Sequence, residues 1–290
     1  MDITREFVRL KRPCAAGFRW FLRHFEGGSN YQELLDALVA DGRVDDARWA
    51  LEHFGPTSEV RTVDDLGAES VVFAGTLVVK RNLEATGLVQ AGRAIRVGGS
   101  ANVGGALISG EDLLVEGGIR CEDRIEAGGD LRADWGVEAR EGVSCRGNLR
   151  AARHVRCGGP LQVGGDAFIG LELEAEGDVE CGKGLQAGAD IRVAGNLRAG
   201  HGIVAAGEIR AGQHVEAGWG IKAGAAIVAA GAIRAGESLL AGDDIRAGEG
   251  YGVFAGLGVQ VDAWEVSARV CAQRKPERLM SGWWDSAPAY

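Results

Sequence analysis

The strongest constraint on this chain is a six-residue period. An apolar residue recurs at every sixth position from Val71 to Leu257, and no step requires an insertion. A representative stretch, IRAGQHVEAGWGIKAGAAIVAAG, has alanine two positions after each aliphatic residue and glycine soon afterwards. Side chains alternate between the two faces of a strand, so two inward residues spaced by two form a short strand. Because glycine permits a tight corner, each hexad is predicted to be one strand and one corner.

Three such sides, closed into a coil, predict the fold class. The chain is expected to be mainly β: a three-sided parallel β-helix of about 18 residues per coil, with a small N-terminal α-helical domain. Residues 71–262 hold 32 hexads. This predicts roughly 10 to 11 coils and a rod of roughly 50 Å, at about 4.8 Å per coil. An α-helix is excluded because a strict six-residue period does not stay on one face of a 3.6-residue repeat.

The composition changes at both ends of the repeat. Residues 1–57 are predicted to be a helical domain with three helices: one after Pro13, one from the Ser29/Asn30 cap to Gly42, and one that ends at Gly55. Residues 58–70 are expected to be a linker and the entry to the solenoid, 71–262 the β-helix, and 263–290 a C-terminal cap and tail. One last strand is expected in WEVSARVCA. Solenoid ends need caps, since an open coil exposes apolar side chains and unpaired strand edges.

The overall composition limits the compartment and the partner. The chain has 290 residues, 47 glycines, 5 prolines and a net charge of −9, which suits a fold with very many turns. The sequence MDITREFVRL lacks the apolar run of a secretory signal, and no run of 18 apolar residues predicts a transmembrane helix. We therefore expect a cytoplasmic protein that does not enter a membrane. The negative charge favours a basic partner, although moderate acidity is also a simple aid to solubility.

The repeat resembles two known groups of β-helices. One is the hexapeptide-repeat transferases, with the γ-class carbonic anhydrases, and the other is the filament-forming bactofilins. The transferases usually place the small residue two positions before the aliphatic one, whereas here it follows, as in IRAGQH. They also commonly carry a loop between coils and a catalytic histidine, but these hexads run unbroken, and His154, His201 and His214 fall at corners that do not align. No Ser/His/Asp set, P-loop or CxxC motif is present, so we predict no enzyme, no catalytic residue, no cofactor and no metal site.

Four cysteines, Cys121, Cys145, Cys157 and Cys181, occupy the second inward position of a hexad. Cys121 and Cys157, like Cys145 and Cys181, are two coils apart, which is roughly 9.6 Å and exceeds the ~7 Å Cα limit for a disulfide. They are predicted to be small buried hydrophobic groups, in keeping with a reducing cytoplasm. A metal cluster or a redox pair is the alternative.

Outward positions that are 18 residues apart should stack on one face of the rod. One column predicts a ladder of opposite charges between coils; it reads Arg120, Glu138, Arg156, Glu174 and Arg192. These mixed signs exclude mimicry of duplex DNA, which would need about 30 negative charges over the rod, and no direct nucleic-acid contact is expected. A second column repeats apolar residues on a solvent face; it reads Val78, Arg96, Leu114, Arg132, Arg150, Phe168, Gln186, Val204, Lys222 and Leu240.

Apolar side chains that recur on a solvent face indicate a contact surface, unless the N-terminal helices or the tail cover it. Two tryptophans at corners add exposed anchors, because Trp is enriched in interface hot spots. The adjacent tryptophans of the tail are further candidates, although such aromatics also fold back to cap a last coil. The predicted partner-binding residues are Val78, Leu114, Phe168, Val204, Leu240, Trp135, Trp219, Trp283 and Trp284.

The segment CAAGFRWFLRHFEGGSNYQELLDALVADGRVDDARWALEHFG resembles a short helical module that precedes repeat domains in bacterial proteins of toxin systems. The layout of the chain is similar to immunity proteins of type VI secretion effectors that guard against nuclease toxins. This resemblance implies a non-enzymatic protein that binds a basic toxin domain and occludes its active site. The alternative is a structural scaffold or filament protein related to bactofilins, with a hexapeptide-repeat transferase as the third candidate. The oligomeric state stays open.

Overall fold

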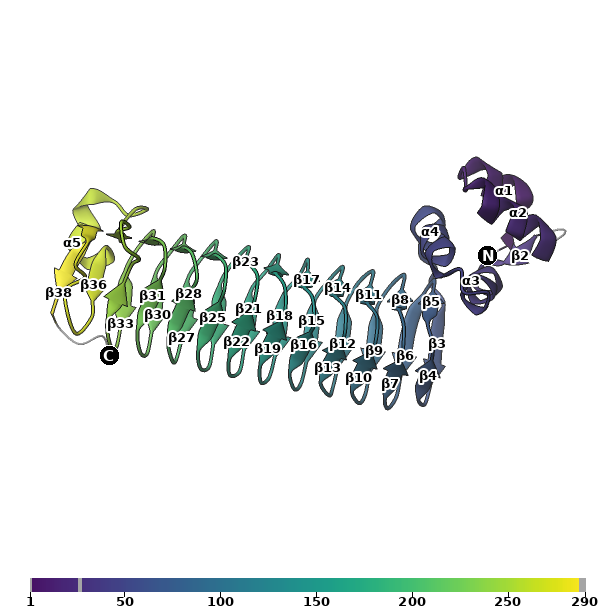
Figure 1. Cartoon of the computed structure of the whole chain (residues 1–290), viewed down its shortest axis with the longest axis horizontal. Helices are drawn as coiled ribbons and strands as arrows, with labels where there is room; N and C mark the ends of the chain where they lie inside the picture. Colours follow the sequence, from purple (N-terminus) through teal and green to yellow (C-terminus); the bar gives the residue numbers. More distant parts are fainter. Residues whose placement is uncertain (1, 26–27, 287–290) are drawn as a thin grey trace.

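The structure, a computed structural model, describes residues 2–25 and 28–286. It is a long rod of stacked coils, with helices at its N-terminal end and the last strands at the other (Figure 1). The rod is a parallel β-helix of about 13 coils with roughly 18 residues per coil, which confirms the predicted fold class. There are more coils than the hexads alone predicted, because strands also form on both sides of residues 71–262.

Each regular coil contributes one strand to each of three parallel sheets. The thirteen-stranded sheet contains β3 (Val60–Val63), β6 (Thr76–Val79), β9 (Ile95–Val97), β12 (Leu113–Val115), β15 (Leu131–Ala133), β18 (Leu149–Ala151), β21 (Ala167–Ile169), β24 (Leu185–Ala187), β27 (Ile203–Ala205), β30 (Ile221–Ala223), β33 (Leu239–Ala241), β36 (Arg269–Cys271) and β38 (Trp283–Asp285). The twelve-stranded sheet contains β5 (Val71–Phe73), β8 (Val89–Ala91), β11 (Leu107–Ser109), β14 (Ile125–Ala127), β17 (Val143–Cys145), β20 (Leu161–Val163), β23 (Val179–Cys181), β26 (Leu197–Ala199), β29 (Val215–Ala217), β32 (Ile233–Ala235), β35 (Val253–Phe254) and β37 (Leu279–Ser281). The eleven-stranded sheet contains β4 (Leu66–Ala68), β7 (Leu83–Ala85), β10 (Ala101–Val103), β13 (Ile119–Cys121), β16 (Val137–Ala139), β19 (Val155–Cys157), β22 (Leu173–Ala175), β25 (Ile191–Val193), β28 (Ile209–Ala211), β31 (Ile227–Ala229) and β34 (Ile245–Arg246).

Two inward residues per strand build the core. In β18, Leu149 and Ala151 are buried, whereas Arg150 between them is exposed. The register places Leu149 opposite Leu131 and Ala167, each 18 residues away, so equivalent positions stack along the rod. The first inward position is nearly always large and aliphatic, and the second is mostly alanine, valine or cysteine. Bulky and small layers therefore alternate, which fills the narrow interior at close packing.

Polar side chains at several corners link one coil to the next. The Asn148 Oδ1 atom accepts a hydrogen bond from the Asp166 backbone N–H at 3.0 Å, and Asp166 Oδ1 accepts one from Gly184 N at 3.0 Å. The Asn148 backbone N–H in turn donates to Asp130 Oδ1 at 2.7 Å. Each side chain thus satisfies a main-chain donor that the corner would otherwise leave without a partner, and the corner is held in register by the previous coil.

The rod extends beyond the hexads at both ends. Residues 58–70, expected as a linker and entry, contain β3 and β4, which already pair with β6 and β7. After the last hexads come a short 3₁₀ helix (Val261–Ala263) and helix α5 (Trp264–Ser267). The WEVSARVCA segment supplies the expected strand as β36, and the tail adds β37 and β38. The chain therefore closes its C-terminal end with two strands that the pattern did not predict.

The N-terminal module holds four helices rather than the predicted three. They are α1 (Arg5–Leu10), α2 (Ala15–His24), α3 (Tyr31–Ala40) and α4 (Val44–Phe54), and β1 (Asp2–Ile3) pairs with β2 (Ser29–Asn30) in an antiparallel ribbon. The Asn30 cap and the Gly55 end lie where the sequence predicts them. Helix α1 was missed because its six residues are too few to display an apolar period; Thr4 caps it by accepting a hydrogen bond from the Phe7 N–H.

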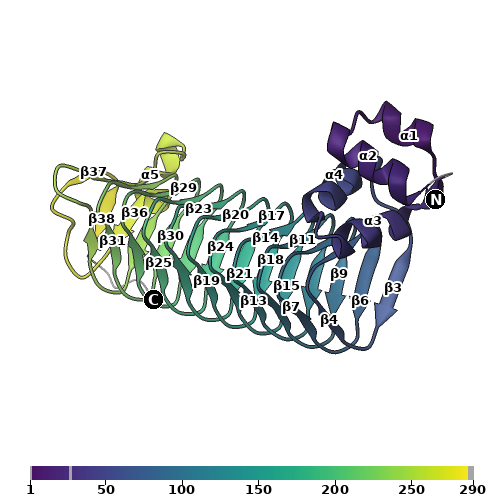
Figure 2. The same ribbon diagram turned by 45° about the vertical axis from the view of Figure 1, so that its right-hand side comes forward.

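The module packs against the side of the first coils of the twelve-stranded sheet (Figure 2). Gln32 of α3 is buried and uses its amide as a strand would. Its Nε2 donates to Val72 O at 3.0 Å, and its Oε1 accepts from Ala74 N at 3.0 Å. One glutamine therefore satisfies both main-chain groups at the free edge of β5. An ion pair between Arg61 and Asp36 at 3.0 Å adds a second link between rod and module.

Replacement of Asn148 by alanine should weaken the corner ladder. The Asp166 N–H loses its acceptor, so we expect the free energy of unfolding to fall by about 1 kcal/mol. Guanidinium denaturation followed by circular dichroism measures the change. Gln186→Ala removes an equally exposed amide for which the described residues offer no hydrogen bond, and it should leave the stability unchanged. Equal effects of the two substitutions would contradict a role for the ladder.

Replacement of Gln32 by leucine should loosen the module from the rod. The change keeps the size of the side chain but leaves Val72 O and Ala74 N without partners, at a cost of about 1–3 kcal/mol. Limited proteolysis in residues 55–59 should then release the module faster than in the parent protein. Glu33→Gln, on the exposed side of the same helix turn, is the control. Unchanged cleavage in Gln32→Leu would show that other contacts hold the module.

Candidate protein-binding surface

The predicted partner-binding residues gather on one side of the rod, formed by the thirteen-stranded sheet and its two edges. The outward column has the predicted 18-residue register, since Val78 pairs with Arg96, and Phe168 with Arg150 and Gln186. Phe168 and Val204 are each 40% exposed. The other apolar members of the column, Val78, Leu114 and Leu240, are half-buried.

This column carries positive charge despite the acidity of the chain. Its charged members are Arg96, Arg132, Arg150 and Lys222, and it contains no acidic residue. Arg132 pairs with Asp134 at 2.8 Å, and the Arg150 guanidinium lies 5.2 Å from the Phe168 ring centroid. Cation–π contact of this kind holds an exposed aromatic ring in place. The face therefore combines ordered apolar groups with cations.

Trp219 and Trp135 lie on opposite edges of this sheet. The Trp219 edge consists of the corners that follow strands of the twelve-stranded sheet, and there Trp219 stacks on His201 with ring centroids 4.1 Å apart. The Trp135 edge consists of the corners that follow strands of the thirteen-stranded sheet. On it, Arg153 covers the Trp135 ring at 4.3 Å, and Leu171 is the next exposed residue of the column. The two tryptophans are more than four coils apart, roughly 20 Å along the rod, so they do not form one cluster.

The two tail tryptophans have different surroundings. Both belong to β38, the last strand of the same sheet, where Trp284 pairs with Val270 and packs against the solenoid core. Trp283 pairs with Arg269 and remains 45% exposed. Trp284 thus closes the last coil, and of the pair Trp283 is the better placed to touch a partner.

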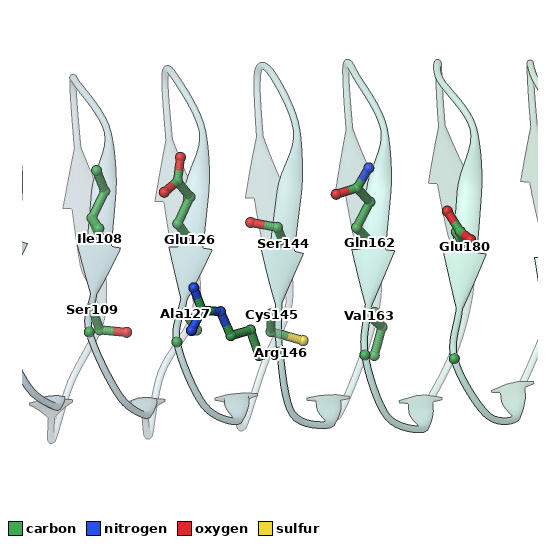
Figure 3. A pocket seen from close by; sticks show the side chains of 14 residues that line it. Ile108, Ser109, Glu126, Ala127, Ser144, Cys145, Arg146, Gln162, Val163 and Glu180 are labelled. Carbon is green, nitrogen blue, oxygen red and sulfur yellow. The ribbon is translucent and has the colours of Figure 1, made fainter.

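A shallow groove on the twelve-stranded sheet was not predicted. It has a volume of about 730 Å³ and follows five successive strands, from Ile108 of β11 to Glu180 of β23. Outward side chains of these strands form a row along it (Figure 3). The signal was present in the sequence as a column of glycines at corner positions, interrupted by Arg146. Its effect depends on side-chain size at stacked corners rather than on the hexad period.

The three histidines of the solenoid occupy three different edges of the rod. His154 Nε2 lies 3.0 Å from Glu138 Oε1 on the Trp135 edge, and His201 stacks on the Trp219 edge. His214 lies on the third edge, where its Nδ1 accepts the Ala232 N–H at 2.9 Å. They cannot act on one substrate. Within residues 2–25 and 28–286, no group of three potential metal-ligating His, Cys, Asp or Glu side chains comes together.

The inward cysteines are buried free thiols. Burial raises the pKa of Cys145 to about 12, of Cys157 to about 11 and of Cys181 to about 12. Thiolate is the form that binds metals and attacks electrophiles, so these residues are inert at neutral pH. Cys14 of the helical module is the exposed cysteine.

Comparison with known proteins identifies the N-terminal module. Residues 1–54 match the model of a family described as the YdhT N-terminal domain. The match ends at the last residue of α4 and so leaves the solenoid outside it. No curated protein and no solved structure gives a significant match to the chain. None of the helices in the described part of the chain has both the length and the apolar character needed to cross a membrane.

Thiol reactivity should separate Cys14 from the other five cysteines. With an aromatic disulfide reagent, one thiol should react rapidly, and the buried thiols should stay slow from pH 7 to pH 9 because their pKa values lie above this range. Unfolding returns these thiols to a pKa near 9, so their contribution to stability is full below that pH and decreases as the pH rises towards 11. Guanidinium should expose all six. Rapid reaction of two or more thiols in the folded protein would contradict their burial.

Proposed function

We propose that this chain is a non-enzymatic binding protein that holds a protein partner against the side formed by the thirteen-stranded sheet. The observation that carries the proposal is the exposure of Phe168 and Val204, each 40%, on a face that the rest of the described chain leaves open. The N-terminal module packs on a different sheet, and β36 and β38 extend this sheet at its end without folding over it.

The surroundings of these residues favour a protein contact. Phe168, Trp135 and Trp219 are each ordered by a stacked cation or ring, so little side-chain freedom is lost when a partner covers them. Aromatic and arginine side chains dominate binding energy in protein interfaces. The stacked coils provide a rigid backbone beneath them, and a preformed surface binds with less ordering cost than a mobile one.

We further propose that the partner is a bacterial toxin and that this chain is its immunity protein. The similarity in layout to immunity proteins of type VI effectors supports this assignment. The net charge of −9 supports a basic toxin, such as a nuclease domain, through complementary charge. Inhibition would be steric: a rod laid across the substrate cleft excludes the nucleic acid. The expected place of action is the cytoplasm, where such a toxin meets its substrate.

A structural scaffold is the second candidate, and the N-terminal end of the rod favours it. Gln32 caps the edge of β5, but β3 and β4 end their sheets with no described strand on the outer side. Free strand edges are templates for pairing with another chain. End-to-end association would use these edges and would not need the apolar face.

Substitution of Phe168 and Val204 by glutamate should abolish partner binding. A partner purified with the wild-type chain from the native bacterium should lose affinity by about tenfold or more, because two charges enter an apolar contact. Val228→Glu is the matched control, a half-buried outward valine at the same strand position on the eleven-stranded sheet, and it should bind normally. The toxin assignment requires that the wild-type chain, at equimolar ratio, stops the activity of that partner. Recovery of the chain alone, or of ordered filaments in electron micrographs, would favour the scaffold.

A further inference from the structure

The groove on the twelve-stranded sheet continues the surface that already carries the helical module. The module covers the first strands of this sheet: Val72 and Ala74 are buried against it, and Arg48 Nε donates to Gln90 Oε1 at 3.2 Å. The groove starts at the next strand, β11, which pairs directly with β8. One continuous sheet face is therefore occupied at one end and open beyond it.

The shape of the groove suits an extended segment laid along the rod. One row consists of the outward side chains of successive strands, among them Glu126, Ser144 and Gln162, which lie one coil apart in Figure 3. Beside it, the first corner position after each strand is mostly glycine, which leaves a trough; these residues are Gly110, Gly128, Arg146, Gly164 and Gly182. The glycines are required here, because a Cβ on Gly128 or Gly182 would overlap the carbonyl oxygen of the corner in the preceding coil.

The negative charge of the chain gathers around this groove. The five strands that line it and the corners on both sides of each occupy residues 104–112, 122–130, 140–148, 158–166 and 176–184. These segments contain four cations, Arg124, Arg140, Arg146 and Lys183, and eleven acidic residues: Glu111, Asp112, Glu122, Asp123, Glu126, Asp130, Glu141, Asp166, Glu176, Asp178 and Glu180.

Internal pairing leaves most of this charge uncompensated. Arg124 pairs with Glu126 and Asp123, and Lys183 lies 4.0 Å from Asp166. Glu180 is exposed on the row, and no ion pair to it is found among the described residues. By contrast, the outward column of the thirteen-stranded sheet carries only cations as charged groups. The two sides of the rod therefore differ in sign, and they meet along the Trp219 edge.

We infer that this groove binds a basic, extended segment of a protein partner. The inference rests on the proposed function and deepens it: the thirteen-stranded sheet holds the apolar part of the partner, and the groove holds a lysine- or arginine-rich part that reaches over the Trp219 edge. Carboxylates on both sides of a trough attract cationic side chains and repel phosphates, so the occupant is protein rather than nucleic acid. Opposite charge also speeds encounter, and this effect weakens as salt rises.

Decalysine is a probe for the groove that does not require the natural partner. Fluorescence anisotropy of labelled decalysine at low salt measures binding to the full chain. Glu126→Lys with Glu180→Lys should weaken this binding by about tenfold or more. The control is Glu84→Lys with Glu116→Lys, which makes the same change in net charge at exposed positions outside the groove; it should weaken binding by less than about threefold.

The outcomes separate the groove from the proposed function. Equal loss in both double variants, or no binding of decalysine to the parent chain, would overturn the groove as a specific site. Phe168→Glu with Val204→Glu should leave decalysine binding intact while it abolishes capture of the natural partner. Retained decalysine specificity without any toxin partner would defeat the immunity role and leave the groove standing. Circular dichroism and thermal midpoints confirm that each variant is folded.

Discussion

The whole rod depends on coil-to-coil main-chain pairing at a constant interval of 18 residues. Leu149 can sit between Leu131 and Ala167 only because every intervening corner keeps the same length. Inside, this pairing stacks large aliphatic residues on one another and alanines beside them. Outside, it turns a sequence interval into a straight column of side chains. A single inserted residue would shift every later inward position to the solvent side, which is why the hexads run without interruption.

The sequence was sufficient to predict the repeat, the parallel strands and the stacked columns, because all three follow from period two within a hexad and period eighteen between coils. Leu66 and Val60 fall off the six-residue steps, so β3 and β4 were read as a linker. Helix α1 was too short to show a period. Nothing in the pattern indicated which face the helical module would cover, since that contact depends on one buried glutamine, Gln32, and on the local fit of α3 and α4.

The candidate surfaces were predictable to different degrees. The column with Phe168 and Val204 follows directly from the register. The position of Trp135 and Trp219 on opposite edges also follows from it, but only once the three sheets are numbered in order. The groove depends on how far side chains project at stacked corners, and a hydrophobic period carries no information about that. The net charge of −9 concealed a division of sign between faces, because a sum over the chain discards position.

The glutamine that fixes the helical module has a consequence for how such proteins are assembled. Gln32 contacts the carbonyl of Val72 and the amide of Ala74, groups that every strand possesses whatever its side chains. An adaptor that recognises main chain alone is interchangeable between rods of unrelated sequence. The boundary of the family match at residue 54, where α4 ends, fits a detachable fitting of this kind. The length of the rod and the identity of its fitting can then change independently of each other.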